Sequence, residues 1–449
     1  MHPHLPPTPP LHSRERSERS EHRLLLRDPL AFYLALTQQV GDLVCYRSTP
    51  ELAFLVNHPD HIRHVLVENH SNYTKDTYIN HMFKTMVGDG LLTSEGEAWR
   101  RQRRFIQPAF HPQRLARLDA LVTSQVAAML ARWEAASALG QPLNLAHEMS
   151  ALTLAITTQA LFGVDLGEDV SLVGHAVDMG GALLARPKDP RFRQGLQVID
   201  DIVHRIILSR RAGGAASEAS ASPRDDLLGA MMSLRDPATG LGWDDSSLRH
   251  QVITLLLAGY ETTASALSWT FYLLSQNPDV VGRLRLELGA SLGGRPPVYA
   301  DLPSLPYTRQ VFEESLRLYP PAWILGRVAL EDDHLGEYTV PAGTILAISP
   351  YTVHRRPASW DDPERFVPAR PAPTRFTYIP FGAGPRQCIG KPLALMEAQL
   401  IIAMVVQRFD LALVPDHEIK PEVVFVLRPD RQMKVTLTPA TGSPEWSQI

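Results

Sequence analysis

The stretch that decides the fold is Phe381-Gly-Ala-Gly-Pro-Arg-Gln-Cys388-Ile-Gly390. It places Cys388, one of only two cysteines in the chain, between glycines and two residues after Arg386. An apolar helical pattern over residues 392–408 follows directly, and its initial proline is tolerated in a first helical turn. Cys388 therefore precedes a helix N-terminus, where the helix dipole and a neighbouring arginine favour a thiolate.

A thiolate on this loop is compatible with several kinds of chemistry. A lone cysteine is usually a buried, inert side chain, and a thiol of depressed pKa also suits redox or nucleophilic roles. The glycines allow the backbone to approach a flat partner closely. A single thiolate is also the proximal ligand of one class of haem iron.

Composition indicates a globular protein of ordinary type. Hydrophobic residues make up 44% of the 449 positions and charged residues 20%. The net charge of −4 lacks the basic excess that is typical of nucleic-acid-binding proteins, so no nucleic-acid partner is expected. Two cysteines, Cys45 and Cys388, argue against a disulfide framework and indicate a reducing compartment.

The segment pattern predicts a single domain over residues 24–449. Residues 1–23 are rich in proline and polar side chains, which indicates a disordered tail. The N-terminal region has no apolar run long enough for a signal sequence or a membrane anchor, so a cytoplasmic location is expected. Residues 211–223 are of low complexity and predict a flexible loop between two helices.

Helical patterns dominate from residue 112 to 318, and strand-like segments occupy residues 41–55, 329–348 and 432–437. The fold class is therefore mainly α (α+β), with small sheets. The longest helical pattern runs from Asp245 to Asn277, and its roughly 33 residues would span about 50 Å. This helix is apolar on nearly all faces, so it is expected to cross the core.

In the middle of this helix stands Ala258-Gly-Tyr-Glu-Thr-Thr263. Glycine and consecutive polar residues are locally unfavourable in an apolar helix. Hydroxyls that bond the preceding turn predict a local kink or an inserted water. The segment is either a packing defect or a place where Glu261 and Thr262 handle protons beside a ligand.

Three weaker patterns accompany the cysteine loop and the polar segment of the long helix. Trp99 and Arg103 are four residues apart and share one helix face, although a basic helix is usually only a solvated surface. Glu314 and Arg317 form an i,i+3 pair, which is common on helices. A third pattern, Gly326-Arg327-Val-Ala, places an arginine in a strand-like segment.

Taken together, the motifs resemble the cytochrome P-450 family, and they occur in that family's order from Trp99 to Gly390. Phe381-x-x-Gly384-x-Arg386-x-Cys388-x-Gly390 is similar to its haem-binding signature, and the resemblance covers residues 30 to 438. It implies the cytochrome P-450 fold, of the bacterial soluble type, with the long central helix over the haem. It also implies that Cys388 is the metal ligand of a haem b.

The resemblance implies roles for individual residues. Thr262 would hydrogen-bond iron-bound dioxygen and water, and Glu261 would belong to the proton-delivery route. The other implied cofactor-binding residues are Trp99 and Arg103 at one haem propionate, Arg327 at the other, Arg386 as a further propionate partner, and Phe381 in the signature. Glu314 and Arg317 would be joined by Arg365 in a structural triad, and His354 would be structural.

The implied activity is a haem-thiolate monooxygenase, an oxidoreductase that inserts one atom of dioxygen into an apolar small molecule such as a fatty acid or terpene. Alternatives are a peroxide-using peroxygenase or isomerase and a non-catalytic haem-binding protein. Electrons would come from NAD(P)H through a separate ferredoxin or flavodoxin with its reductase, because no flavin or iron–sulfur motif is present. The chain is expected to act as a monomer.

The resemblance to the family also predicts two functional surfaces. Arg101, Arg104 and Lys391 form either a basic patch for an acidic redox partner or scattered solvated charges. Substrate-facing positions are expected in residues 77–92, 253–262, 321–325 and 425–427, which carry few charges and include Phe83, Met86, Leu256, Ile324 and Phe425.

Overall fold

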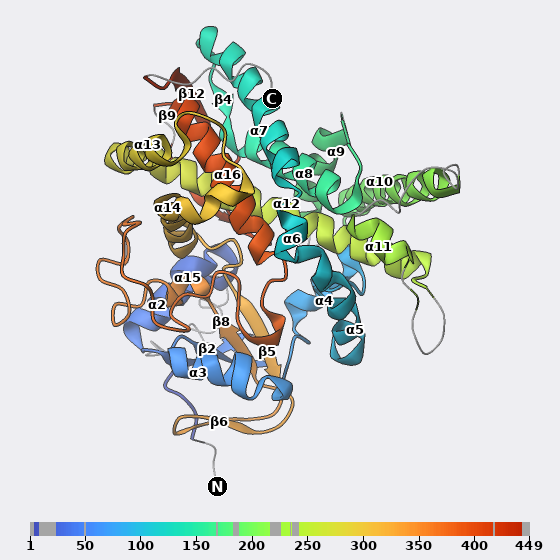
Figure 1. Cartoon of the computed structure of the whole chain (residues 1–449). Coiled ribbons are helices and arrows are strands. Elements are labelled where there is room, and N and C mark those ends of the chain that lie inside the picture. Colours follow the sequence, from blue (N-terminus) through green and yellow to red (C-terminus); the bar gives the residue numbers. More distant parts are fainter. Residues whose placement is uncertain are drawn as a thin grey trace. The chain divides into compact units, whose positions relative to one another are not determined.

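The computed structural model, shown in Figure 1, describes residues 4–8, 24–48, 51–167, 169–182, 188–215, 226–233, 235, 242–415 and 418–441. The chain divides into two compact units. The first unit comprises residues 1–81, 313–388 and 425–427, and the second comprises residues 82–312, 389–424 and 428–449.

The first unit is built on a five-stranded sheet of order β1-β2-β8-β5-β3. Its strands are β1 (Leu43–Ser48), β2 (Glu51–Val56), β8 (Ile345–Ile348), β5 (Leu325–Ala329) and β3 (Tyr73–Thr74). Strands β2 and β8 are parallel, and the other neighbours are antiparallel. Phe54, Leu346 and Ile348 belong to the buried core of this unit. Strands β1, β2 and β8 fall in the segments predicted as strand-like, residues 41–55 and 329–348, whereas β3 was not predicted.

The remaining elements of the first unit are short. They are the hairpin β6 (Asp333–Leu335) and β7 (Tyr338–Val340), and the helices α2 (Pro29–Gln39), α3 (Pro59–Arg63) and α15 (Pro350–Val353). Two helices continue from one unit into the other along the chain, α4 (Tyr78–Val87) and α14 (Pro306–Leu318). Each of α2, α3 and α15 begins with proline, whose fixed φ suits a first helical turn.

Part of the predicted N-terminal tail is ordered against the first unit. The amide of Cys45 donates to the carbonyl of Pro7 at 2.9 Å, and the amide of Thr339 donates to the carbonyl of His4 at 2.8 Å. Residues 4–8 thus bind to β1 and to β7. The rest of the predicted tail, residues 1–3 and 9–23, lies outside the described residues.

The second unit is mainly helical. Its helices are α5 (Gly96–Ile106), α6 (Pro112–Leu115), α7 (Asp119–Ala138), α8 (Leu145–Phe162), α9 (Asp169–Ala182), α10 (Pro190–Ala215), α11 (Leu227–Ser233), α12 (Asp245–Gln276), α13 (Pro278–Leu292) and α16 (Lys391–Arg408). A three-stranded sheet has the order β4 (Leu143–Asn144), β12 (Lys434–Pro439) and β9 (Phe409–Leu413). Two further short strands are β10 (Pro421–Val423) and β11 (Leu427–Pro429). The prediction of a mainly α fold with small sheets is confirmed.

The long helix α12 has nearly the predicted bounds. Asp244 caps its first turn by accepting a hydrogen bond from the Ser247 amide at 2.6 Å, and Pro278 follows its C-cap. Nearly every residue of its middle is buried, and it packs along α8. Close packing requires Gly259, because a Cβ there would lie 2.7 Å from Cγ2 of Thr157. This helix is the central element of the second unit, as predicted.

The predicted flexible loop over residues 211–223 was placed too early in the chain, because its first residues are helical. Helix α10 continues through Ala215, and residues 216–223 lie outside the described residues. Alanine is the strongest helix former and can extend a helix that has already formed across neighbouring glycines, so low complexity alone misplaced the helix end. Among the described residues, no helix has the length and apolar character needed to cross a membrane.

Candidate active site

The cysteine loop in the first unit holds its thiol exposed. The amide of Cys388 donates to the carbonyl of Phe381 at 2.9 Å, and the amide of Gln387 donates to the carbonyl of Gly384 at 3.0 Å. Gly384 has φ +69°, and a Cβ there would lie 1.8 Å from the carbonyl oxygen of Leu66. Glycine is therefore required both for the turn and for its contact with the segment His64–Glu68 (η1). The helix α16 begins at Lys391, close to the predicted position.

His354 connects this loop to the Arg317 helix. Its Nε2 accepts a hydrogen bond from the Ile379 amide at 2.8 Å, so its Nδ1 carries the proton and donates to the Arg317 carbonyl at 3.1 Å. Burial lowers the pKa of His354 to about 3, so the ring is neutral at ordinary pH. The expected structural role of His354 agrees with these contacts.

The predicted Glu314–Arg317–Arg365 triad is wrong in its third member. Arg317 binds Glu314 through two hydrogen bonds of 2.8 and 2.9 Å, and Arg370 Nε donates to Glu314 at 2.9 Å. The side chain of Arg365 is 74% exposed and pairs with Asp362. Its backbone carbonyl instead accepts hydrogen bonds from Arg317 and Arg370. The turn after Asp362 directs Arg370 inward. The spacing of residues along the sequence did not reveal this direction.

The other predicted cofactor residues of the first unit flank the sheet and the loop. Arg327 lies on β5, is 8% exposed and donates from Nη1 to the Gly326 carbonyl at 2.8 Å. Arg386 ends the short helical turn Gly384–Arg386 (η5), and Arg386 and Phe381 are both half-buried. A guanidinium held in this way is suited to a carboxylate because its planar fork pairs with both oxygens.

In the second unit, Trp99 and Arg103 share a face of α5 as predicted. The guanidinium carbon of Arg103 lies 5.9 Å from the centre of the Trp99 ring. Arg101 and Arg104 are exposed, and Arg104 pairs loosely with Glu97 at 3.9 Å. The Trp99 and Arg103 side chains therefore lie against each other, while the remaining arginines of the helix face solvent.

Glu261 and Thr262 lie next to each other on α12 but point to different sides. Thr262 is half-buried, and its Oγ1 donates to the Ala258 carbonyl at 2.8 Å. Ala258 is exposed, whereas residues 251–257 are buried. Glu261 is 3% exposed. The predicted bonding of hydroxyls to the preceding turn is confirmed, and the helix continues through it without a break.

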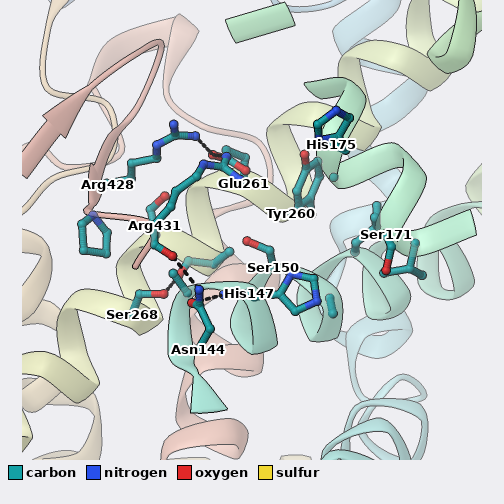
Figure 2. A pocket seen from close by; sticks show the side chains of 18 residues that line it. Asn144, His147, Ser150, Ser171, His175, Tyr260, Glu261, Ser268, Arg428 and Arg431 are labelled. Carbon is teal, nitrogen blue, oxygen red and sulfur yellow. Dashed lines mark hydrogen bonds and ion pairs between the residues drawn. The ribbon is translucent and has the colours of Figure 1, made fainter. Parts of the chain in front are cut away.

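Glu261 is held by two arginines that sequence reasoning missed. Its carboxyl lies 3.4 Å from Nη1 of Arg428 and 3.8 Å from Nη2 of Arg431. Figure 2 shows both arginines on the same side of α12 as Glu261. Burial raises the pKa of Glu261, and the charge of Arg428 opposes that rise only in part. The signal in the sequence was the pair of arginines in Arg428-Pro-Asp-Arg431, directly after an apolar segment.

The predicted substrate-facing positions are only partly accessible. Leu256 and Met86 are almost completely buried, whereas Phe83, Ile324 and Phe425 are half-buried. On α12 the accessible face begins at Ala258 and includes Thr262. Within the predicted helix stretch 253–262, the accessible residues therefore lie at the C-terminal end.

The residues present fit a thiolate-bound haem. Cys388 is exposed on a loop whose glycines allow close backbone approach, and Arg327 is a buried cation suited to a carboxylate. Within the described part of the chain, no group of three or more His, Cys, Asp or Glu side chains is arranged to hold a metal ion. A single cysteine is the ligand set that a cofactor with its own ring nitrogens requires from a protein.

An exposed cysteine on a glycine loop and an acid–threonine pair on a long central helix define a haem-thiolate oxidoreductase. Residues 24–437 match the family model described as Cytochrome P450, and this chain belongs to that family. The predicted family membership and the predicted fold are confirmed. The chain is a haem-dependent monooxygenase that uses dioxygen and acts on an apolar substrate.

Similar proteins of known activity include three bacterial ones. Cyclooctatin synthase of Streptomyces melanosporofaciens is 37% identical over 94% of this chain and 92% of its own length. Cyclooctat-9-en-7-ol 5-monooxygenase of the same organism is 37% identical over 87% of each chain. Pentalenene oxygenase of Streptomyces avermitilis is 32% identical over 93% of this chain and 94% of its own length.

Proposed function

We propose that this chain hydroxylates a cyclic terpene or terpene alcohol. The observation that carries the proposal is its similarity, over most of its length, to enzymes named for cyclooctat-9-en-7-ol and pentalenene, which modify terpenes. The low charge of the expected substrate-facing segments and the accessible face at Ala258 and Thr262 support an apolar substrate.

We assign Cys388 as the residue whose thiolate would bind the haem iron. Trp99 with Arg103, Arg327 and Arg386 would hold the propionates, and Phe381 would pack beside the thiolate. When bound, the haem supplies dioxygen activation and the transfer of one oxygen atom to substrate. Thr262 would hold a proton-conducting hydroxyl on the accessible face of α12, and Glu261 would supply protons to it.

The electrons would come from NAD(P)H through a separate ferredoxin or flavodoxin and its reductase. The exposed positions of Arg101 and Arg104 on α5 support a surface that attracts an acidic partner. Cys45 and Cys388 are not joined in a disulfide, which supports a reducing compartment such as the cytoplasm.

The test is turnover of a substrate panel by the haem-loaded protein. Cyclic terpenes, their alcohols and fatty acids are each supplied with ferredoxin, reductase and NADPH, or with peroxide alone. We expect a terpene product that carries oxygen from isotopically labelled dioxygen and that depends on the electron donors. Product formation with peroxide alone would indicate a peroxygenase. Haem binding without consumption of the electron donor would indicate a non-catalytic binding protein. A preference for fatty acids would overturn the terpene assignment.

A further inference from the structure

A polar pocket of about 370 Å³ lies within the second unit, between α8, α9, α12 and the segment 428–431. Figure 2 shows Arg428 and Arg431 on one side of it and His175 and Ser171 on the other. This volume falls in the range of pockets that hold small organic ligands, about 300–1,000 Å³. Thr262 does not line the pocket, which therefore lies on a different side of α12 from the accessible face.

The side chains that line the pocket carry an excess of positive charge. Arg428 and Arg431 contribute two guanidinium groups, and Arg428 also binds Glu422 at 3.2 Å, outside the pocket. Among the described residues that line the pocket, Glu261 is the one acid, and burial raises its pKa, which favours its neutral form. Its contacts with the two arginines, 3.4 and 3.8 Å, exceed the usual length of a charge-assisted hydrogen bond, about 2.7–2.9 Å. One carboxyl therefore does not neutralise both cations.

Arg431 is the cation that a ligand can reach most easily. Its side chain is 38% exposed, whereas that of Arg428 is 10% exposed. Burial lowers the pKa of Arg431 to about 10, since the protein does not fully restore the hydration that the guanidinium loses. A phosphate or carboxylate group beside Arg431 would restore it, because the planar guanidinium fork pairs with two oxygens at once.

Two helices also direct their N-terminal turns at the pocket. Residues from both first turns line it, namely Ala146 and His147 of α8 and Val170 and Ser171 of α9. The N-terminus of a helix carries partial positive charge and attracts anions. The acids of these turns, Glu148 and Asp169, do not line the pocket and pair with Arg132 and Arg205. The helix ends therefore add to the positive potential of the two arginines.

The rest of the wall consists largely of neutral groups that can form hydrogen bonds. The side chains concerned are those of Asn144, His147, Ser150, Ser171, His175, Ser265 and Ser268. Hydroxyl, amide and imidazole groups both donate and accept, so they suit the hydroxyl groups of a ligand. His147, Ser171 and His175 are exposed, whereas Ser268 is 1% exposed. The pocket is thus open to solvent at one end and closed at the other.

We propose that this pocket binds a small hydroxylated organic anion, a phosphate or a carboxylate. Its charged group lies at Arg431 and Arg428, and its hydroxyl groups lie against the serine and histidine wall. This ligand differs in charge and polarity from the apolar substrate, and its site is formed without any residue of the cysteine loop. The pocket is therefore a second binding site, in addition to those for haem and substrate.

The first test is calorimetric titration of the haem-loaded protein at constant ionic strength with inorganic phosphate, glycerol 3-phosphate and citrate. We expect one site per chain. At least one of the two organic anions should bind at least about threefold more tightly than inorganic phosphate, since each added hydrogen bond contributes a modest amount. Preference for glycerol 3-phosphate would assign a phosphate ligand, and preference for citrate a carboxylate ligand.

Substitution of Arg431 locates the charged group of the ligand. Arg431→Gln should weaken binding at least about tenfold, because it removes a charge-assisted pair of hydrogen bonds. Arg431→Lys keeps the charge without the planar fork and should lose less. Lys434→Gln removes the same charge from an exposed residue three positions later that does not line the pocket, and it should leave the affinity unchanged.

A bulky side chain at the open end tests the route of entry. Ser171→Trp should abolish binding of all three anions. Leu172→Trp adds the same side chain next door on α9, at an exposed residue that does not line the pocket, and should leave binding unchanged. Thermal unfolding without added anion verifies that each variant is folded. Ser150→Phe, which fills the pocket from α8, repeats the test if Ser171→Trp folds poorly.

Absence of saturable binding by all three anions would overturn the proposal, as would unchanged affinity in both Arg431→Gln and the pocket-filling variant. Equal losses in Lys434→Gln and Arg431→Gln would also overturn it, because they would indicate unspecific attraction to a basic surface. Tighter binding of inorganic phosphate than of either organic anion would contradict recognition of hydroxyl groups. None of these measurements requires a terpene or an electron donor, so failure of the proposed function is distinguishable.

Discussion

At the scale of single residues, one buried carboxylate organises the segments around the cysteine loop. Glu314 accepts hydrogen bonds from Arg317, from Arg370 and from the amide of Val367 at 3.0 Å. Arg317 in turn donates to the carbonyl of His354, whose ring receives the Ile379 amide ahead of the signature. A continuous set of hydrogen bonds thus joins the α14 helix to the loop that carries Cys388.

Substituting Arg370 tests this network. Arg370→Ala removes one of two cations from a carboxylate that is 5% exposed, so we expect the free energy of unfolding to fall by about 2–3 kcal/mol. Arg365→Ala removes an exposed ion pair and should change it by less than about 1 kcal/mol. Urea unfolding of the two variants measures both values. A larger loss in Arg365→Ala than in Arg370→Ala would contradict the assignment of Arg370 as the third member.

At the scale of elements, the cysteine loop depends on one glycine for both its turn and its contact. Gly384 combines a positive φ with a backbone neighbour, the Leu66 carbonyl, that cannot move away like a flexible side chain. The exposed thiol is therefore positioned by backbone packing of η5 against η1, in addition to its own hydrogen bond to Phe381.

We predict different losses of stability for two glycine-to-alanine substitutions. Gly293→Ala, at φ +58° with nothing within 4 Å of the added Cβ, should cost about 1–2 kcal/mol for the left-handed backbone alone. Gly384→Ala should cost clearly more and should also lower haem content, because the loop must shift to clear Leu66. Thermal unfolding and the haem-to-protein ratio provide the measurement. Equal losses at the two positions would mean that the Leu66 contact does not position the loop.

The sequence predicted elements and local motifs well because their signals lie within one helix or one turn. The bounds of α12, the shared face of Trp99 and Arg103 and the glycine loop around Cys388 all follow from spacing. Contacts between distant segments were not predictable in this way. The partner of Glu261 lies 167 residues away at Arg428, and Arg370 replaced Arg365 because a turn, rather than a periodic pattern, sets its direction.

At the scale of the whole molecule, stability should depend on pH through Glu397. This side chain of α16 is 2% exposed, and its Oε1 has no hydrogen-bond partner among the residues that the structure describes. Burial raises its pKa to about 8. In the unfolded chain the carboxyl has an ordinary pKa near 4.5. Between these two values the folded state keeps a proton that the unfolded state has released, so raising the pH destabilises the folded state.

The matched experiment uses Glu397→Gln. Between pH 5.5 and 7.5 the wild type should lose about 1.4 kcal/mol of unfolding free energy for each pH unit relative to the variant. Glutamine has nearly the same shape and no titration, so the difference between the two proteins isolates this one group. Urea unfolding at the two pH values measures it. Parallel pH profiles would show that Glu397 is not protonated in the folded state.

The most direct measurement of the central claim, that Cys388 binds haem iron as a thiolate, is the absorption spectrum of the reduced, carbon monoxide-bound protein. The wild type and Cys45→Ala should both give the red-shifted Soret band of thiolate ligation, and Cys388→Ser should lose it while the protein remains folded. A wild-type spectrum without that band, or a Cys388→Ser protein that retains it, would contradict the assignment of Cys388 as the iron ligand.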